Sequence, residues 1–230
     1  MGVDTASIAA NLETVRERIA RGAHRAGRKP EEITLVAVSK TFPAESIRLA
    51  YAAGVRHFGE NRVQEWEKKQ PLLADLEATW HLVGHLQSNK AARGARLFRS
   101  IDTLDSLHLA QKLDHALAPA AARLTVLIEV RLAPEETKNG ANEAGLPALT
   151  EAVLRLPHLD LRGLMCIPPY FDDPQQARPY FRRLRELRDA LRLPELSMGM
   201  SHDFDVAIEE GATQVRLGTA IFGPRLAAND

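Results

Sequence analysis

Strand-like and helix-like segments alternate along almost the whole chain. Eight short runs rich in apolar and β-branched residues are separated by segments with helical periodicity, and short connections join them. The predicted strands span 33–38, 55–58, 79–83, 97–101, 123–130, 159–166, 196–199 and 214–217. Eight strands alternating with helices are what an α/β fold of the (β/α)8 TIM barrel type requires. An open doubly wound sheet, which usually has fewer strands, is the alternative.

The N-terminal segment predicts a helix that precedes the first strand. Apolar residues recur on one face of segment 4–27, at Ile8, Leu12, Val15 and Ile19. Little sequence remains after Gly223 for a full eighth helix, so the additional N-terminal helix is expected to cover that gap in the outer ring. Further helices are predicted over 62–76, 105–118, 175–191 and 201–210, with Asp102 and Asp105 as helix-start residues.

Composition excludes several classes of function. The 230 residues contain 30 basic and 30 acidic side chains, so a net charge of zero gives no broad footprint for nucleic acid or an anionic membrane. The arginine-rich stretch 178–188 is better explained as a solvated helix face than as an RNA site. A lone cysteine, Cys166, excludes internal disulfides and fits a buried strand position. A cytoplasmic protein with a single domain over 1–230 is expected, because no leader, membrane span or linker is recognisable.

Polar residues follow the predicted strands where a barrel would gather them at one mouth. They are Lys40, Asn61, His81, His85, Lys138, Tyr170, Ser201, Arg216 and Thr219. Lys40 ends the first strand, where its amine can reach a ligand, although a lysine there can also be merely solvated. His81 and His85 are four residues apart, but Gly84 and the strand between them favour structural histidines over a metal pair.

The exits of the last two strands predict a phosphate site. Ser201 is expected to begin a helix as its N-cap, and Gly218-Thr219 follows the final strand. In barrels this region commonly binds phosphate through backbone N–H groups and hydroxyls, and Gly218 would allow close approach. Capping alone is the other explanation for Ser201.

An amine at strand one and a phosphate site at strands seven and eight suit a small aromatic phosphate ester that carries an aldehyde. Pyridoxal 5′-phosphate (PLP) is such a molecule, and Lys40 would bind it as an internal aldimine. Burial and a neighbouring cation such as Arg216 would favour the neutral amine that this condensation needs. An arginine near the pyridine nitrogen would also weaken the electron sink.

Six segments, in order through nearly the whole chain, resemble the pyridoxal phosphate homeostasis proteins. They are VSK at 38–40, FGENRVQE at 58–65, WHLVGHLQSNK at 80–90, GLM at 163–165, LSMGMS at 196–201 and VRLGTAIFG at 215–223. The resemblance implies a barrel like the N-terminal domain of alanine racemase, with Lys40 as the cofactor lysine. It also implies Ser201, Gly218 and Thr219 at the phosphate and Arg216 at the pyridine nitrogen. Asn61, His81 and Met165 would lie around the cofactor.

Two positions depart from the patterns of these families. His202 stands where the family often has an acidic or small residue, which bears on how this turn contributes to the phosphate site. Racemases carry a Met-Gly-Arg-x-Gly stretch after the fifth strand, whereas this chain has Thr137-Lys138-Asn139-Gly140.

The expected function is PLP binding without catalysis, and the resemblance implies a role in intracellular PLP homeostasis and supply and in amino-acid homeostasis. A racemase, the alternative, needs a second base, usually a tyrosine from a further domain, and only Tyr170 lies at a predicted strand exit. A barrel enzyme acting on sugar phosphates through Lys40 is a third possibility. The expected partners are the cofactor and, transiently, PLP-dependent apoenzymes, and the chain is expected to be a monomer.

Overall fold

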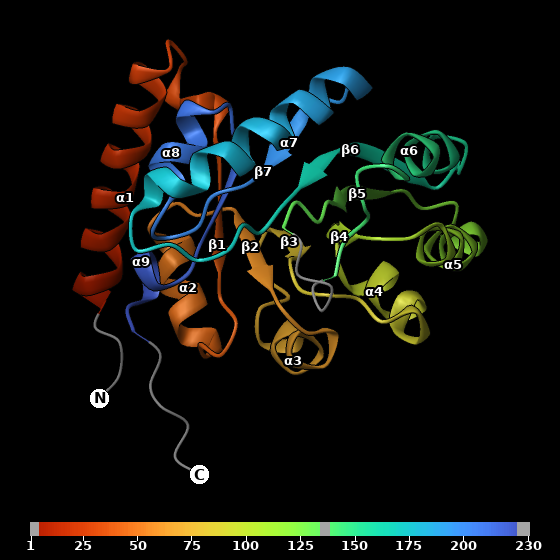
Figure 1. Ribbon diagram of the computed structural model, residues 1–230. Coiled ribbons are helices and arrows are strands. Elements are labelled where there is room, and N and C mark those ends of the chain that lie inside the picture. Colours follow the sequence, from red (N-terminus) through yellow and green to blue (C-terminus); the bar gives the residue numbers. More distant parts are fainter. Residues whose placement is uncertain (1–4, 134–138, 225–230) are drawn as a thin grey trace.

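The fold is a closed barrel of eight parallel strands in chain order, which confirms the TIM-barrel prediction (Figure 1). A computed structural model describes residues 5–133 and 139–224. The strands are β1 (Thr34–Val38), β2 (His57–Glu60), β3 (Thr79–Leu82), β4 (Ser100–Leu104), β5 (Leu124–Glu129), β6 (Leu159–Met165), β7 (Glu195–Ser197) and β8 (Gln214–Leu217). Pairing of β1 with β8, through Val36 and Arg216 among others, closes the ring.

Helices surround the barrel. They are α1 (Thr5–Arg25), α2 (Ala44–Ala52), α3 (Val63–Lys69), α4 (Ala91–Leu97), α5 (Leu107–Leu117), α6 (Leu146–Leu154), α7 (Arg178–Leu191), α8 (Phe204–Glu209) and α9 (Thr219–Phe222). The first of them, α1, packs against α8, α9 and α2, and buries Ile8, Leu12, Val15 and Ile19 as predicted. The N-terminal helix therefore covers the place where α9 is too short to do so.

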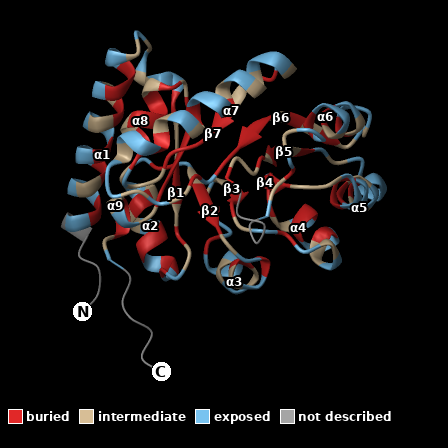
Figure 2. Ribbon diagram, in the orientation of Figure 1, coloured by how far each residue is buried: buried red, intermediate tan, exposed pale blue. Residues whose placement is uncertain are grey.

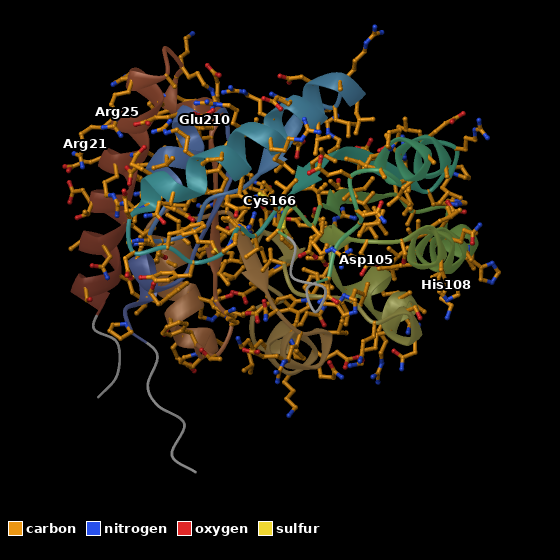
Figure 3. All side chains as sticks on the ribbon, viewed as in Figure 1. Arg21, Arg25, Asp105, His108, Cys166 and Glu210 are labelled. Carbon is orange, nitrogen blue, oxygen red and sulfur yellow. The ribbon has the colours of Figure 1, made fainter. Side chains whose placement is uncertain are left out.

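Burial follows the two layers of the barrel. The strands and the inner sides of the helices are buried, and the outer sides of the helices are exposed (Figure 2). Side chains such as Arg21 and Arg25 on α1 and His108 on α5 project outward, whereas Cys166 lies near the centre of the molecule (Figure 3). No helix in residues 5–133 and 139–224 is long and apolar enough to cross a membrane.

Several predicted boundaries are wrong, and the reasons are local. The apolar run 97–101 is split: Leu97 ends α4, and the strand begins only at Ser100. Asp102 is therefore a buried residue of β4 rather than a helix start. The helix predicted over 62–76 stops at Lys69 and continues as a short 3-10 helix, because Pro71 has no N–H to extend the α-helical ladder.

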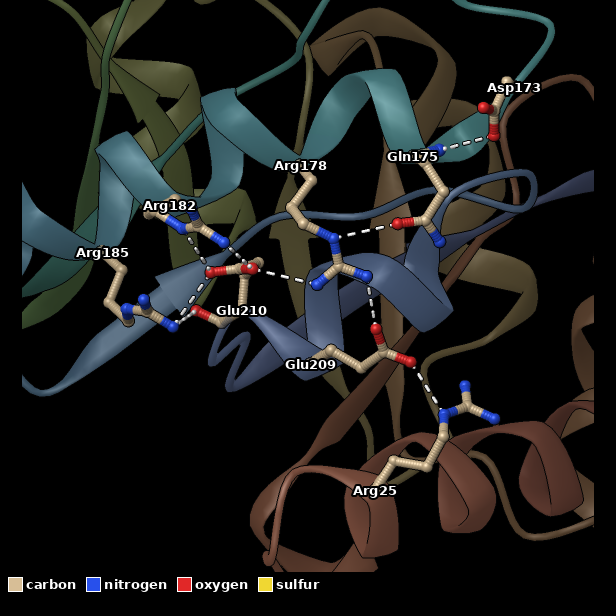
Figure 4. Close-up of polar contacts among 8 residues, drawn as sticks. All are labelled: Arg25, Asp173, Gln175, Arg178, Arg182, Arg185, Glu209 and Glu210. Carbon is tan, nitrogen blue, oxygen red and sulfur yellow. Dashed lines mark hydrogen bonds and ion pairs between the residues drawn. The ribbon is translucent and has the colours of Figure 1, made fainter.

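An arginine–glutamate network joins three helices on the outer surface (Figure 4). The buried carboxylate of Glu210, just after α8, accepts bonds from Arg178 (2.9 Å) and Arg182 (3.1 Å) of α7 and pairs with Arg185 (3.0 Å). Glu209 bridges Arg178 to Arg25 of α1. The basic stretch of α7 thus binds acidic residues of its own chain.

Candidate functional site

A cleft of about 270 Å³ opens at the carboxyl ends of the strands. The residues that line it come from the exits of β1, β2, β3, β6, β7 and β8, and this end of a TIM barrel is where ligands bind. Six of the eight residues expected at the cofactor line this cleft together: Lys40, Asn61, Ser201, Arg216, Gly218 and Thr219.

Lys40 lies in a tight turn just beyond β1. The backbone N–H of Phe42 donates to the carbonyl oxygen of Ser39 (3.1 Å), so Lys40 and Thr41 occupy the two middle positions of the turn. Ser39, the residue directly after β1, is fully buried, and its Oγ donates to the buried Glu60 (2.7 Å). Lys40, the next residue, lines the cleft.

Asn61 is fixed by a close approach of two loops. A Cβ atom at Gly84 would lie 2.3 Å from the carbonyl oxygen of Asn61 and 2.8 Å from its side-chain carbon. Only glycine allows the exit of β3 to pack so tightly against the exit of β2. The amide of Asn61 is held at the cleft wall by this contact.

The corner formed by the exits of β7 and β8 contains the hydroxyl of Ser201 and the first turn of α9. Ser201 is not the N-cap predicted from the sequence, because α8 begins three residues later, after Asp203. Its Oγ instead accepts the backbone N–H of Ala220, in the first turn of α9 (3.2 Å). A hydroxyl that accepts one bond can still donate its own hydrogen, so Ser201 can donate to an anion in the cleft. Phe42 and Phe222 stack at 4.9 Å and join this corner to the Lys40 turn.

Arg216 of β8 lies on the floor of the cleft and is 4% exposed. Its guanidinium donates to Ser197 Oγ (2.7 Å) and to the carbonyl oxygen of Cys166 (2.9 Å). Burial lowers the pKa of Arg216, and the nearby carboxylates of Asp102 and Glu129 act in the opposite direction. Two N–H donors of the Arg216 guanidinium are therefore bonded to the protein, and they hold this planar cation in one orientation toward a ligand in the cleft.

A chain of polar side chains continues from Arg216 through the barrel interior. Gln214 donates to Ser197 Oγ (2.8 Å) and to Asp102 Oδ2 (2.7 Å). Asp102 also accepts from Ser100 (2.5 Å) and lies 3.2 Å from His81 Nδ1. Burial alone would raise the pKa of Asp102, but His81 and these hydrogen bonds outweigh burial and lower it.

Two residues expected around the cofactor are not brought to the cleft. His81 lies deeper in β3, its ring bonds to Asp102 and His57, and it lines a separate cavity of about 580 Å³ at the opposite end of the barrel. Met165 is fully buried at the end of β6 and does not line the cleft. His85 lies near Asp105 at 3.4 Å, and Lys138 lies outside the described residues.

His202 and Tyr170 form the rim of the cleft. Their rings stack at 5.4 Å, and His202 Nε2 lies 3.0 Å from the carbonyl oxygen of Asp172. His202 thus joins the exits of β6 and β7, and Tyr170 remains 76% exposed. The departure from the family pattern at position 202 therefore lies beside the cleft and contacts the neighbouring loop.

Sequence reasoning missed the residues that hold Arg216. Ser197 and Gln214 are polar residues within strands that are buried on both faces, which is the signal that could have revealed them. Polar groups there need partners inside the barrel, because buried polar groups are almost always hydrogen-bonded.

The cleft combines an amine, a buried guanidinium, a hydroxyl and the backbone of a short helix start. This donor set suits a small molecule that has an anionic group at one end and an electrophilic carbon within reach of Lys40. Gly218 lines the same corner, and a Cβ atom there would lie 3.4 Å from the carbonyl oxygen of Val38, an ordinary contact distance. The residues present therefore fit a phosphorylated aldehyde such as PLP.

The sequence was compared with known protein families and with individual relatives. Residues 3–225 match the family model described as alanine racemase, N-terminal domain. A pyridoxal phosphate homeostasis protein of Aquifex aeolicus is 48% identical over 220 residues, which cover 93% of this chain and 96% of the relative. The protein of the same name from Escherichia coli K12 is 43% identical over 228 residues, covering 95% of this chain and 97% of the relative.

Solved structures are similar as well. PipY of Synechococcus elongatus with PLP bound is 40% identical, with a TM-score of 0.84 over 94% of this chain and 100% of PipY. Alanine racemase of Corynebacterium glutamicum shares the fold, with a TM-score of 0.70 at 19% identity over 100% of this chain and 64% of the racemase. The chain belongs to the family of pyridoxal phosphate homeostasis proteins.

Proposed function

We propose that the chain binds PLP in the cleft at the carboxyl ends of the strands, with Lys40 as the covalent attachment point. The observation that carries this proposal is the convergence of Lys40, Arg216 and the Ser201 corner on one small cleft. Lys40 would form a Schiff base with the cofactor aldehyde. Ser201, Gly218 and Thr219 would bind the phosphate, and Asn61 would contact the ring. The relative PipY, whose structure contains PLP, supports the choice of cofactor.

We further propose that the protein holds and releases PLP rather than using it in catalysis. Arg216 would face the pyridine nitrogen, and a buried guanidinium disfavours protonation of that nitrogen, which weakens PLP as an electron sink. In this role the whole chain acts as one cofactor-binding domain, a cytoplasmic monomer that supplies PLP to apoenzymes and supports amino-acid homeostasis. The names of the relatives from Aquifex aeolicus and Escherichia coli support a homeostatic role.

Absorption spectroscopy tests the binding proposal. Adding PLP to the protein should produce the visible band of a protonated Schiff base, and borohydride reduction should leave a mass adduct on the peptide that contains Lys40. Lys40→Ala should abolish both signals, whereas Lys112→Ala, an exposed lysine on α5, should change neither. A wild-type protein without the band, or a Lys40→Ala protein that keeps it, would contradict the proposal.

An amino-acid racemase is the second candidate, and the position of Tyr170 in the lining of the cleft favours it. Racemisation requires removal of the substrate α-proton. With the PLP-loaded protein, the α-protons of amino acids would therefore exchange with deuterated solvent faster than they do in the presence of free PLP alone. Proton NMR of a broad amino-acid panel measures this exchange. Rates equal to those of free PLP support the carrier function, and a rate that falls in Tyr170→Phe supports the racemase.

A further inference from the structure

The turn that carries Lys40 has a strained backbone. Three non-glycine residues in the described part of the chain have a positive φ: Thr41 (φ 68°), Ala121 and Arg192. The last two follow the ends of helices, where this conformation is common. Thr41 follows no helix and is β-branched, so its left-handed conformation is unfavourable and must be held by its surroundings.

Two residues of α3 hold this turn from the outer side of the barrel wall. The backbone N–H of Thr41 donates to Glu65 Oε1 at 2.6 Å. Lys69 Nζ donates to the same carboxylate oxygen (2.7 Å) and to the carbonyl oxygen of Ser39 (3.0 Å). Hydrogen bonds from a helix therefore fix both peptide groups that flank the Cα atom of Lys40.

Glu65 and Lys69 form an ion cluster with a third residue, Glu60, whose burial is energetically unfavourable. Glu60 is fully buried; its Oε1 accepts from Ser39 Oγ (2.7 Å) and Lys69 Nζ (3.0 Å), and its Oε2 has no hydrogen-bond partner within the described residues. Burial raises the pKa of Glu60, and Lys69 and Ser39 only partly oppose this. Burial also acts to raise the pKa of Glu65, but the bonds from Lys69 and Thr41 lower it overall, so Glu65 stays ionised.

Docking of α3 does not require these charges. Its apolar face, Val63 and Trp66, is buried, and Trp66 stacks on Trp80 of β3 at 3.8 Å. Replacing a buried ion cluster by well-packed apolar residues of similar volume generally leaves the folded protein at least as stable. What the charges add is the pair of bonds to the backbone on either side of Lys40.

We propose that Glu65 and Lys69 are positioning residues for Lys40: they hold the turn at residues 39–42 so that Nζ is presented to the aldehyde carbon of the cofactor. This inference rests on the proposed function of Lys40. Condensation of an amine with an aldehyde forms one C=N bond and releases the oxygen as water, so the attachment is a reversible equilibrium. We call the hydrogen bonds of Glu65 and Lys69 to this turn the turn clamp. The turn clamp raises the fraction of bound cofactor that is covalently attached, whereas the Ser201 corner provides the affinity for the phosphate.

The test measures the apo backbone and the covalent fraction separately. Amide hydrogen exchange at Thr41 in the protein without PLP reports the clamp. With PLP, equilibrium dialysis gives the total bound cofactor, and borohydride reduction followed by peptide mass spectrometry gives the fraction fixed to Lys40. The test variants are Glu65→Ala and Lys69→Met, and the control is Glu67→Ala. Glu67 lies on the same helix, but its carboxylate pairs with Arg93 (3.4 Å) and not with the Lys40 turn.

Glu65→Ala should speed exchange at Thr41 and lower the covalent fraction. The ratio of covalently attached to non-covalently bound PLP should fall about five- to thirty-fold, the range that corresponds to losing one modest stabilising interaction. Total bound PLP should change less, because the phosphate contacts remain. Adding Thr41→Gly to Glu65→Ala should restore the covalent fraction, because glycine adopts a positive φ without strain. A purely structural role of Glu65 would show no such rescue. Glu67→Ala should behave as the wild type.

An unchanged covalent fraction in Glu65→Ala, or an equal loss in Glu67→Ala, overturns the inference. If Glu65→Ala does not fold, Lys69→Met carries the test: it keeps the Thr41 bond, releases Ser39 and should still lower the covalent fraction. A wild-type protein without any Lys40 adduct overturns the proposed function, and this role with it. A wild-type adduct with no effect in either variant overturns this inference alone.

Discussion

Ser197 Oγ accepts hydrogen bonds from Arg216 Nη1 at 2.7 Å and from Gln214 Nε2 at 2.8 Å. This one hydroxyl, on the neighbouring strand, connects the guanidinium at the floor of the cleft with the polar chain that crosses the barrel. All three side chains are buried, so no solvent replaces a lost partner.

Ser197→Ala should therefore destabilise the protein by about 1–3 kcal/mol, because it leaves buried donors of Arg216 and Gln214 unpaired. The free energy of unfolding from urea titration measures this loss. Ser7→Ala, at an exposed position of α1, should change it by less than about 0.5 kcal/mol. We also expect weaker PLP binding in Ser197→Ala, since Arg216 would no longer be held in one orientation. A loss no larger than that of Ser7→Ala would contradict the assigned role.

His57 should make stability depend on pH near neutrality. Burial lowers its pKa from the ordinary value of 6.5, and the neighbouring His81 lowers it further. As the pH falls through 6.5, the unfolded chain takes up a proton at this residue before the folded chain does, so the folded state loses stability until the folded pKa is reached. The loss amounts to at most about 1.4 kcal/mol per pH unit for one proton.

His57→Gln should have a flatter profile of unfolding free energy between neutral and mildly acidic pH. His24→Gln, at an exposed position of α1, should keep the wild-type slope. Urea titrations across this pH range compare the three proteins. Equal slopes in wild type and His57→Gln would show that His57 does not titrate differently in the two states.

Cys166 should be unreactive in the native protein. It is 1% exposed, and burial raises its pKa to about 12. The thiolate is the reactive form, so an aromatic disulfide reagent near pH 8 should react at least about 100-fold more slowly with the native protein than with the unfolded chain. The double variant Cys166→Ala/Ser7→Cys, whose thiol is exposed, should react rapidly in both states. Rapid reaction of native Cys166 would indicate an open path into the barrel.

The barrel itself could be predicted because its signal repeats eight times. The strand predicted over 214–217 is confirmed: apolar Val215 and Leu217 alternate with polar residues between Thr213 and Gly218. The predicted fourth strand begins three residues early because Leu97 and Phe98 extend its apolar run in sequence, although Leu97 is the last residue of α4 and Phe98 is its C-cap. Hydrophobicity marks burial, and it does not separate the end of a buried helix from the start of a buried strand.

The candidate site was partly predictable because barrel topology brings every strand exit to one rim. Lys40, Asn61 and the Ser201 corner follow from that rule, without any knowledge of side-chain contacts. His81 does not, because β3 extends to Leu82 and places it inside the barrel rather than at the mouth. The turn clamp of Glu65 and Lys69 could not be predicted either, since it depends on the positive φ of Thr41, a non-glycine residue.

Glu210 should contribute more to stability than an ordinary surface acid. Its side chain is 5% exposed and pairs with three arginines of α7. Burial acts to raise its pKa, but the bonds from Arg182 and Arg178 prevail and lower it, so the carboxylate is charged at neutral pH. Glu210→Gln should cost about 1.5–3 kcal/mol in the free energy of unfolding, the usual range for a hydrogen bond to a charged group.

Glu151→Gln is the matched control, because Glu151 pairs with one arginine, Arg155, and both side chains are more than half exposed. It should cost less than about 1 kcal/mol. Because the Glu210 carboxylate is stabilised in the folded state, its contribution is present above the ordinary glutamate pKa of 4.5 and is lost as the pH falls through the lower folded value. The difference between wild type and Glu210→Gln should therefore shrink in acid. A difference that stays constant with pH would mean that Glu210 acts through packing rather than through its charge.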